Sequence, residues 1–255
     1  LAYGPIKKSE EGLFVLGFTG IYRTADGDLF EEINAIQGTS SLTLADLKLQ
    51  FLKYENGYVW AGDNPSSSEI ALGAVALYRL IPGQTAWERA ANSGFPGNAT
   101  QSSAEDISYD STTGRYFVAS GQGGVYVSTN GLDWMQQTNG LPGTDGETVV
   151  AHNGTAVLAL KERGIFRSTD GGASWWPTSA PVGKPGDLVR HGERVVFVLN
   201  GLAAQAGGTY FSDDLGANWT RISGPSGTDS ENEWDITTDG TVLHAASATH
   251  RITTV

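Results

Sequence analysis

The chain has 255 residues, with 28 acidic and 16 basic side chains and a formal net charge of −12 at pH 7. Phosphate binding needs a basic face, so this charge argues against nucleic acid as a partner. No apolar run approaches the ~20 residues of a membrane-spanning helix. The absence of cysteine excludes disulfides, thiolate zinc sites and cysteine nucleophiles.

A short turn sequence centred on Asp170 contains residue types that favour a tight hairpin. Gly171 and Gly172 can take the positive φ that such a turn requires. The short polar side chains of Ser168 and Asp170 can bond to N–H groups inside the turn. Trp175 supplies a large apolar ring that must be buried. Related sequences recur at 24–30, 128–134 and 212–219, which indicates a repeated structural unit.

This recurring turn resembles the Asp-box (S-x-D-x-G-x-x-W, the BNR repeat) of the sialidase-like β-propellers. The resemblance implies an all-β fold in which each box joins the third and fourth strands of a blade. It also implies that the box residues are structural and lie on the face opposite the binding cleft. The residues expected in this role are Thr24, Asp26, Ser128, Asn130, Trp134, Ser168, Asp170, Trp175, Ser212, Asp214 and Trp219.

A residue two positions before each turn, aromatic in most copies, gives the register of the repeat. These residues are separated by 40 to 56 positions, a spacing typical of propeller blades. The sequence therefore predicts a six-bladed β-propeller of four-stranded antiparallel blades, forming a single domain over 1–255. The six register positions are Tyr22, Tyr78, Tyr126, Phe166, Tyr210 and His250.

In chain order, the blades are expected at about 1–44, 45–103, 104–145, 146–185, 186–231 and 232–255. The first has strands at 13–17 and 20–23, and Phe30 stands where later blades carry tryptophan. The second keeps Trp87 but lacks the serine and aspartate of the box, and an insertion at 63–73 follows its second strand. The third has strands at 106–110 and 115–120.

The last blade ends inside its third strand. Either it stays three-stranded, or residues 1–8 complete it and leave the first blade short. We favour closure by the terminal strand, because an unclosed ring leaves exposed strand edges. A third alternative is that the sequence is cut from a longer protein.

One group of carboxylates is expected at the mouth of the central channel, because first strands line that channel. Asp106, Asp187 and Asp235 share one position of the repeat, with Glu147 and Glu233 two residues earlier. Such a ring can hold Ca²⁺ through oxygen ligands, or supply the acid and base of a glycosidase. The interpretation we favour is structural, with each aspartate bonding to the backbone of a neighbouring blade. Trp234 lies beside this ring and can stack on a sugar.

A classical sialidase is not expected. Its Arg-Ile-Pro motif is matched here only by Arg79-Leu80-Ile81-Pro82, which has an extra leucine and lies where a box should be. Arginine recurs at this third-strand position in several blades, so Arg79 is interpreted as a blade residue. The other arginines at the position are Arg23, Arg167 and Arg251.

Two functions are consistent with the sequence. The first is a binding module that takes a glycan or protein partner through its loop face and channel mouth. The alternative is a glycoside hydrolase using carboxylates among Asp106, Glu147, Asp187, Glu233 and Asp235. Some Asp-box propellers assist photosystem assembly, but those carry a basic patch that this acidic chain lacks. No cofactor is expected beyond Ca²⁺ at the aspartate ring.

We expect the protein to be secreted or periplasmic. The sequence starts at Leu1 and has Met135 as its only methionine, which suggests that a segment such as a signal peptide was removed. Glycosylation sequons occur at Asn98, Asn153 and Asn218.

Overall fold

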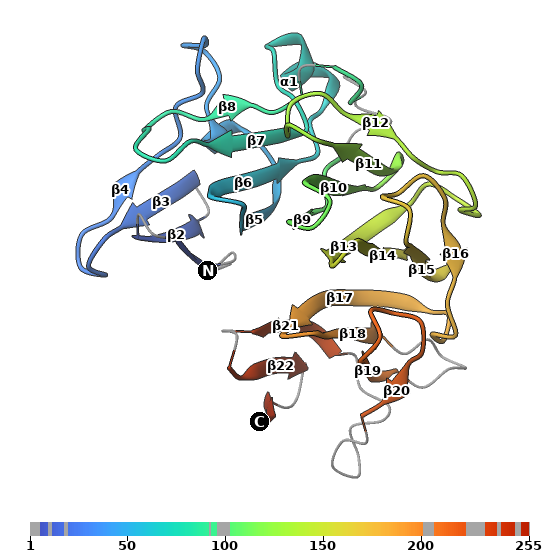
Figure 1. Ribbon diagram of the computed structural model, residues 1–255. Helices are drawn as coiled ribbons and strands as arrows, with labels where there is room; N and C mark the ends of the chain where they lie inside the picture. Colours follow the sequence, from blue (N-terminus) through green and yellow to red (C-terminus); the bar gives the residue numbers. More distant parts are fainter. Residues whose placement is uncertain are drawn as a thin grey trace.

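The computed structural model describes residues 6–9, 12–17, 20–91, 93–95, 103–200, 207–222, 233–238, 241–247 and 251–254, with the backbone alone for parts of the first and last sheets. In these residues, six antiparallel sheets follow one another along the chain, five with four strands and the last with three. The sheets are arranged around a common centre, and β5, β9, β13, β17 and β21 lie nearest to it (Figure 1). The predicted all-β class is confirmed.

Within every sheet the strands lie side by side in chain order. The first sheet comprises β1 (Ile6–Ser9), β2 (Gly12–Gly17), β3 (Gly20–Thr24) and β4 (Glu31–Glu32). The second comprises β5 (Leu49–Glu55), β6 (Tyr58–Asp63), β7 (Leu77–Leu80) and β8 (Glu88–Arg89). The third comprises β9 (Asp106–Asp110), β10 (Arg115–Ser120), β11 (Gly124–Ser128) and β12 (Met135–Gln136).

The fourth sheet comprises β13 (Gly146–His152), β14 (Thr155–Leu160), β15 (Gly164–Ser168) and β16 (Trp176–Pro177). The fifth comprises β17 (Lys184–His191), β18 (Arg194–Asn200), β19 (Gly208–Ser212) and β20 (Thr220–Arg221). The last comprises β21 (Glu233–Thr238), β22 (Leu243–Ser247) and β23 (Arg251–Thr254). A short 3-10 helix, η1 (Leu44–Asp46), precedes the second sheet. The insertion at 63–73 contains α1 (Ser67–Ala71), capped by the Ser66 side chain.

The N-terminal strand does not complete the last sheet, so that expectation is wrong. β1 pairs with β2, with Ile6 opposite Val15, and belongs to the first sheet. A strand this close in sequence to β2 forms a hairpin at a low cost in loop-closure entropy, whereas reaching the last sheet would close the whole chain. The last sheet is three-stranded in the described residues, and β23 forms its edge.

The register of the last sheet corrects a second expectation. Ile236 lies opposite Ala245, and Ala245 lies opposite Ile252. In the fifth sheet the matching chain of pairs leads from Leu188 through Phe197 to Tyr210. The counterpart of Tyr210 is therefore Ile252, and His250, which lies outside the described residues, does not hold that position.

The four box-like turns share a hydrogen-bond scheme. Gly172 N donates to Ser168 Oγ (2.9 Å), while Ser168 Oγ and Ser174 N donate to Asp170 Oδ1 (2.8 and 3.0 Å). The serine and aspartate at Ser212 and Asp214 are bonded in the same way. The turns at Thr24 and Asp26 and at Ser128 and Asn130 are shorter versions, in which the glycine N–H donates to the hydroxyl at 2.9 Å. Each turn is thus closed by its own side chains.

The tryptophan that follows such a turn binds its sheet to the preceding one. Trp134 N donates to Ser93 O (2.9 Å), and the indole N–H donates to Ala90 O (2.7 Å). Trp87 makes the matching bonds to Ala35 O (2.7 Å) and Ile33 O (2.8 Å). Both side chains are buried in clusters that span two sheets. The tryptophans therefore join neighbouring sheets at their outer ends.

We expect Asp170→Ala to lower the free energy of unfolding by about 1 kcal/mol or more, because three donors of the turn lose their acceptor. Ser174 and the other donors hold the pKa of Asp170 below its usual range, so this contribution is present above the ordinary carboxyl pKa and is lost on acidification. Urea unfolding at pH 7 measures the loss. Asp28→Ala, an exposed change in another box turn, is the control, and equal midpoints for both variants would contradict the role of Asp170.

Candidate functional site

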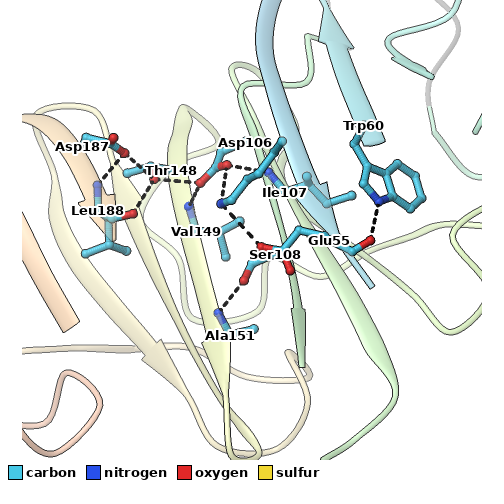
Figure 2. Close-up of polar contacts among 11 residues, drawn as sticks. Glu55, Trp60, Asp106, Ile107, Ser108, Thr148, Val149, Ala151, Asp187 and Leu188 are labelled. Atoms are coloured by element: carbon cyan, nitrogen blue, oxygen red, sulfur yellow. Dashed lines mark hydrogen bonds and ion pairs between the residues drawn. The ribbon is translucent and has the colours of Figure 1, made fainter. Parts of the chain in front are cut away.

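Asp106, at the start of β9, is bonded to three consecutive first strands. Its Oδ1 accepts from Lys53 Nζ on β5 (2.8 Å) and from the N–H of Ile107 (2.8 Å). Its Oδ2 accepts from Thr148 Oγ1 (2.8 Å) and Val149 N (3.0 Å), both on β13 (Figure 2). The carboxylate therefore accepts four hydrogen bonds and links the second, third and fourth sheets near the centre.

Two further side chains of β9 continue these contacts toward the opposite end of the strand. Ala151 N donates to Ser108 Oγ (2.9 Å), and Gly154 N donates to Asp110 Oδ2 (3.0 Å). Asp106, Ser108 and Asp110 alternate along β9 and so face the same side. A first strand has a partner on only one edge within its own sheet, so N–H groups on its other edge need acceptors from elsewhere. Side chains of β9 supply them to β13.

Asp187 lies next to this network and shares the repeat position of Asp106. Leu188 N and Thr148 Oγ1 donate to Asp187 Oδ1 at 2.7 and 3.5 Å (Figure 2). Thr148 is thus close to both aspartates, and it occupies their repeat position in β13. Asp235 has the same register, because Ile236 after it aligns with Leu188.

For the remaining members of the predicted carboxylate ring, the structure gives the position of Glu147 but only the backbone of the others. Glu147 comes directly before Thr148, at the β-bulge of β13, so it is one residue from the aspartate position and not two. The backbones of Glu233, Trp234 and Asp235 lie in β21, with a bulge between Glu233 and Asp235. Their side chains lie outside the described residues, so their roles in ligand binding or catalysis stay predictions.

Sequence reasoning missed the ion pair of Lys53 and Glu55. The Lys53 side chain is 24% exposed and its Nζ lies 3.9 Å from Glu55 and 2.8 Å from Asp106. Burial opposes the charge of Lys53, but the surrounding carboxylates of Asp106, Glu55 and Asp187 outweigh it and raise the pKa of this amine. Burial raises the pKa of Glu55 in spite of Lys53. The signal in the sequence that could have indicated this ion pair is the alternation of opposite charges along a first strand, at Lys53 and Glu55.

An exposed acidic group lies at the loop face, the end of the sheets that carries the links between sheets and the hairpins joining second and third strands. Glu147 is 33% exposed there, 3.8 Å from Lys161 Nζ. Burial raises the pKa of Glu147, Lys161 opposes the shift, and the nearby charges of Glu105 and Asp145 add to it. Among the described residues of the predicted channel mouth, this group, Glu105, Asp145 and Glu147, is charged and partly exposed.

The described residues give no direct support for a metal site. Among them, no three carboxylate or histidine side chains are grouped closely enough to bind a metal ion. Both oxygens of Asp106 already accept two donors each. Since the Asp235 side chain is not described, Ca²⁺ at Asp106, Asp187 and Asp235 stays a prediction. Within the same part of the chain, no helix is long and apolar enough to cross a membrane.

Arg79 has a structural environment. It is 8% exposed, its Nε donates to Glu88 (2.7 Å), and its Nη1 donates to Asn130 O in the turn of the next sheet (3.1 Å). Arg167 donates in the same way to Leu215 O, in the turn of the fifth sheet (2.8 Å). Arg79 and Arg167 therefore each link a third strand to the next turn, and the environment of Arg79 fits its interpretation as a blade residue.

A buried carboxylate begins the insertion at 63–73. Asp63 is fully buried, its Oδ1 accepts from Lys48 N (2.9 Å), and its Oδ2 has no hydrogen-bond partner among the described residues. Burial raises its pKa to about 7, and the N–H donors of Asn64 and Lys48 only partly oppose this. Its backbone bonds to Ala76 O and Ala104 N. Asp63 thus joins the insertion to the segments that lead into β7 and β9.

No family model matches the chain, and no curated protein matches its sequence. Its fold is similar to that of solved β-propellers. It superimposes on virginiamycin B lyase from Staphylococcus aureus with a TM-score of 0.66 at 14% identity, covering 98% of this chain and 79% of that one. The superposition on the GH74 xyloglucanase from Xanthomonas campestris has a TM-score of 0.64 at 14% identity and covers 95% of this chain and 41% of that one. The superposition on YCF48 bound to D1 peptide has a TM-score of 0.61 at 14% identity and covers 96% of this chain and 75% of that one. At such identities the comparison supports a propeller fold alone.

We expect Asp63 to make the protein less stable as pH rises toward neutrality. In the folded state, the Asp63 carboxyl keeps its proton up to about pH 7. In the unfolded state, the same carboxyl has the ordinary pKa of 3.8 and loses its proton at a much lower pH. Stability therefore falls between about pH 4 and pH 7, by about 1.4 kcal/mol for each pH unit of that interval, and is level above it.

The measurement is urea unfolding of the wild type and of Asp63→Asn at pH 5 and pH 8. Wild-type stability should fall more between these values than that of the variant, which keeps a carbonyl for Lys48 N but does not titrate. Equal pH dependence in the two proteins would contradict this role.

Proposed function

We propose that the protein is a binding module that takes a partner through its loop face and channel mouth. The observation that carries this proposal is the environment of Asp106, whose two oxygens are occupied by Lys53, Thr148 and two backbone N–H groups. A carboxylate held in this way supports the ring of first strands and is poorly placed to transfer protons. The exposed charges at the same end of the sheets remain for contact with a ligand.

The charge of the loop face favours a partner segment that carries positive charge. The charges of Glu105 and Asp145 act on Glu147, and the whole chain has a net charge of −12. Complementary charge increases the association rate and selects among partners. That a similar propeller, YCF48, has been solved with a bound peptide is compatible with a protein ligand. A glycan is the other ligand class, with Trp234, Asp187 and Asp235 as its contacts, since the oxygens of Asp106 already accept protein donors.

We further propose that the chain is an Asp-box propeller of six blades that is exported. The hydrogen bonds of the four turns support the first part, because in each turn a serine or threonine hydroxyl accepts a glycine N–H and an aspartate or asparagine oxygen accepts a later N–H. The six sheets of the described residues support the blade number. Export rests on the sequence alone.

The alternative function is a glycoside hydrolase, and one observation favours it. Burial raises the pKa of Glu147, which is the direction of shift that a general acid requires. The fold is also similar to a GH74 xyloglucanase. This alternative needs a second carboxylate about 5–9.5 Å away, drawn from Asp187, Glu233 or Asp235.

One variant, tested in two assays, distinguishes the binding module from the glycoside hydrolase. Glu147→Gln should weaken the binding of a positively charged peptide by a few fold, because it removes one charge from the loop face. The first assay is fluorescence anisotropy with a labelled lysine-rich peptide, compared with a glycan array. The control is Asp28→Asn, an equal loss of charge at a box turn on the opposite face.

The second assay measures release of reducing sugar from a panel of polysaccharides. Turnover by the wild type that Glu147→Gln abolishes would overturn the binding proposal in favour of the hydrolase. Binding that Glu147→Gln and Asp28→Asn weaken equally would show that the loop face is not the site.

A further inference from the structure

The insertion between β6 and β7 is anchored at its two ends. It joins a second strand to a third strand and therefore lies at the loop face. α1 contributes no buried residue, and Leu72 after it is 55% exposed. Beyond it, Gly73 O accepts from Arg89 Nε (2.8 Å), and Ala74 is buried. A segment that buries so little apolar surface opens at a low free-energy cost, and we call residues 64–73 the flap.

The other end of the flap is fixed by the buried carboxyl of Asp63. Lys48 N donates to Asp63 Oδ1 at 2.9 Å, whereas Oδ2 has no hydrogen-bond partner among the described residues. A neutral carboxyl in this position leaves one polar atom without a partner, but a carboxylate also leaves a charge out of water, which costs far more. Asn64, the first residue of the flap, is exposed. A movement of the flap that begins at Asp63 therefore gives Oδ2 access to water.

The charged and titratable groups around Asp63 do not offset this cost. Glu69 of α1 disfavours ionisation of Asp63, and the charge of Lys48, in the link before β5, favours it by less than Glu69 opposes it. The phenol of Tyr78 approaches Asp63 from β7, and burial raises the pKa of this phenol to about 12, so it carries no charge near neutral pH. Arg89 of β8 acts on Tyr78. An ionised Asp63 is thus poorly compensated while the flap is closed.

We propose that the flap is a pH-controlled switch hinged at Asp63. While the Asp63 carboxyl is protonated, the flap is closed and Lys48 N holds its hinge. When the carboxyl ionises, the flap opens at this hinge and water reaches Oδ2. Because the flap lies at the loop face, its position changes the surface that the protein presents there. The switch concerns the flap alone and does not rest on the proposed function.

The direction of the pH dependence follows from the protons that the two forms bind. In the closed form, burial raises the pKa of Asp63 to about 7, whereas in the open form water restores the ordinary pKa of 3.8. Between these values the open form binds fewer protons. The equilibrium constant for opening therefore rises about tenfold for each pH unit from about pH 4 to pH 7, and is level above that.

Hydrogen exchange at two amides measures the opening. Lys48 N donates to the hinge, and Val75 N, directly beyond the buried end of the flap, donates to Tyr78 Oη (2.9 Å). Each rate is compared with that of an unprotected amide at the same pH, which gives a protection factor. We expect both protection factors to fall roughly a hundredfold between pH 5 and pH 7 in the wild type. In Asp63→Asn, which does not titrate, they should stay constant.

Low concentrations of urea distinguish opening of the flap from unfolding of the whole protein. Exchange through a local opening exposes little surface and depends weakly on urea, whereas exchange through global unfolding depends on it steeply. The Leu158 amide of β14 is the reference for global unfolding. We expect the Val75 amide to be less protected than the Leu158 amide and nearly independent of urea.

A second variant tests the flap without altering Asp63. Arg89→Gln removes the bond to Gly73 O, so it should lower the protection of the Val75 amide at both pH values and leave its pH dependence intact. The matched control is Arg167→Gln, which removes a similar bond to the carbonyl of Leu215 in another part of the ring and should leave the Val75 amide unchanged.

Three results would overturn the proposal. The first is an equal pH dependence of Val75 protection in the wild type and Asp63→Asn. The second is equal protection and equal urea dependence of the Val75 and Leu158 amides, since Asp63 would then act on global unfolding alone. The third is an Arg89→Gln variant with wild-type protection at Val75, which would also decide the question if Asp63→Asn did not fold.

Discussion

One constraint applies to every sheet around the common centre: its first strand has an edge whose backbone N–H groups have no partner strand. Side chains of the third sheet bond to such N–H groups of the fourth. Asp106 and Ser108 accept N–H groups of Val149 and Ala151 on the next first strand, and Asp110 accepts the N–H of Gly154 in the turn that follows that strand. Because these acceptors lie at every second residue of β9, one face of one strand satisfies the edge of its neighbour. At the outer ends, tryptophans and arginines join other pairs of neighbouring sheets through backbone carbonyls.

This constraint distinguishes carboxylates that only resemble catalytic residues in the sequence from carboxylates that are available to contact a ligand. A repeated aspartate beside a channel resembles an active site in sequence, yet Asp106 is surrounded by donors and its charge is balanced by Lys53. Removing that carboxylate would leave the largely buried amine of Lys53 with only the longer contact to Glu55, and the N–H of Val149 without its acceptor, which is costly. In the binding function that we propose, ligand contact belongs to groups such as Glu147, which lies at a bulge and is partly exposed.

Much of the fold could be predicted from the sequence, because its signals are local. Glycine, serine and aspartate at fixed spacing define a turn such as that at Asp170, and the strands at 106–110 and 115–120 were placed to the residue. The path of the N-terminal strand was predicted wrongly, since the choice depended on the free-energy difference between a local hairpin and ring closure. The partners of Asp106 could not be predicted in full. Lys53 lies 53 positions away, and only the packing of first strands brings the two together.

Hydrogen exchange at the Val149 amide tests the central claim most directly, namely that first-strand carboxylates serve as acceptors for the neighbouring first strand. It should be compared in the wild type and in Asp106→Asn, with the Leu158 amide of β14 as an internal reference. We expect the Val149 amide to exchange much faster in the variant, because a neutral amide binds this donor less tightly, while the Leu158 amide changes little. Equal exchange of the Val149 amide in the two proteins would contradict the claim.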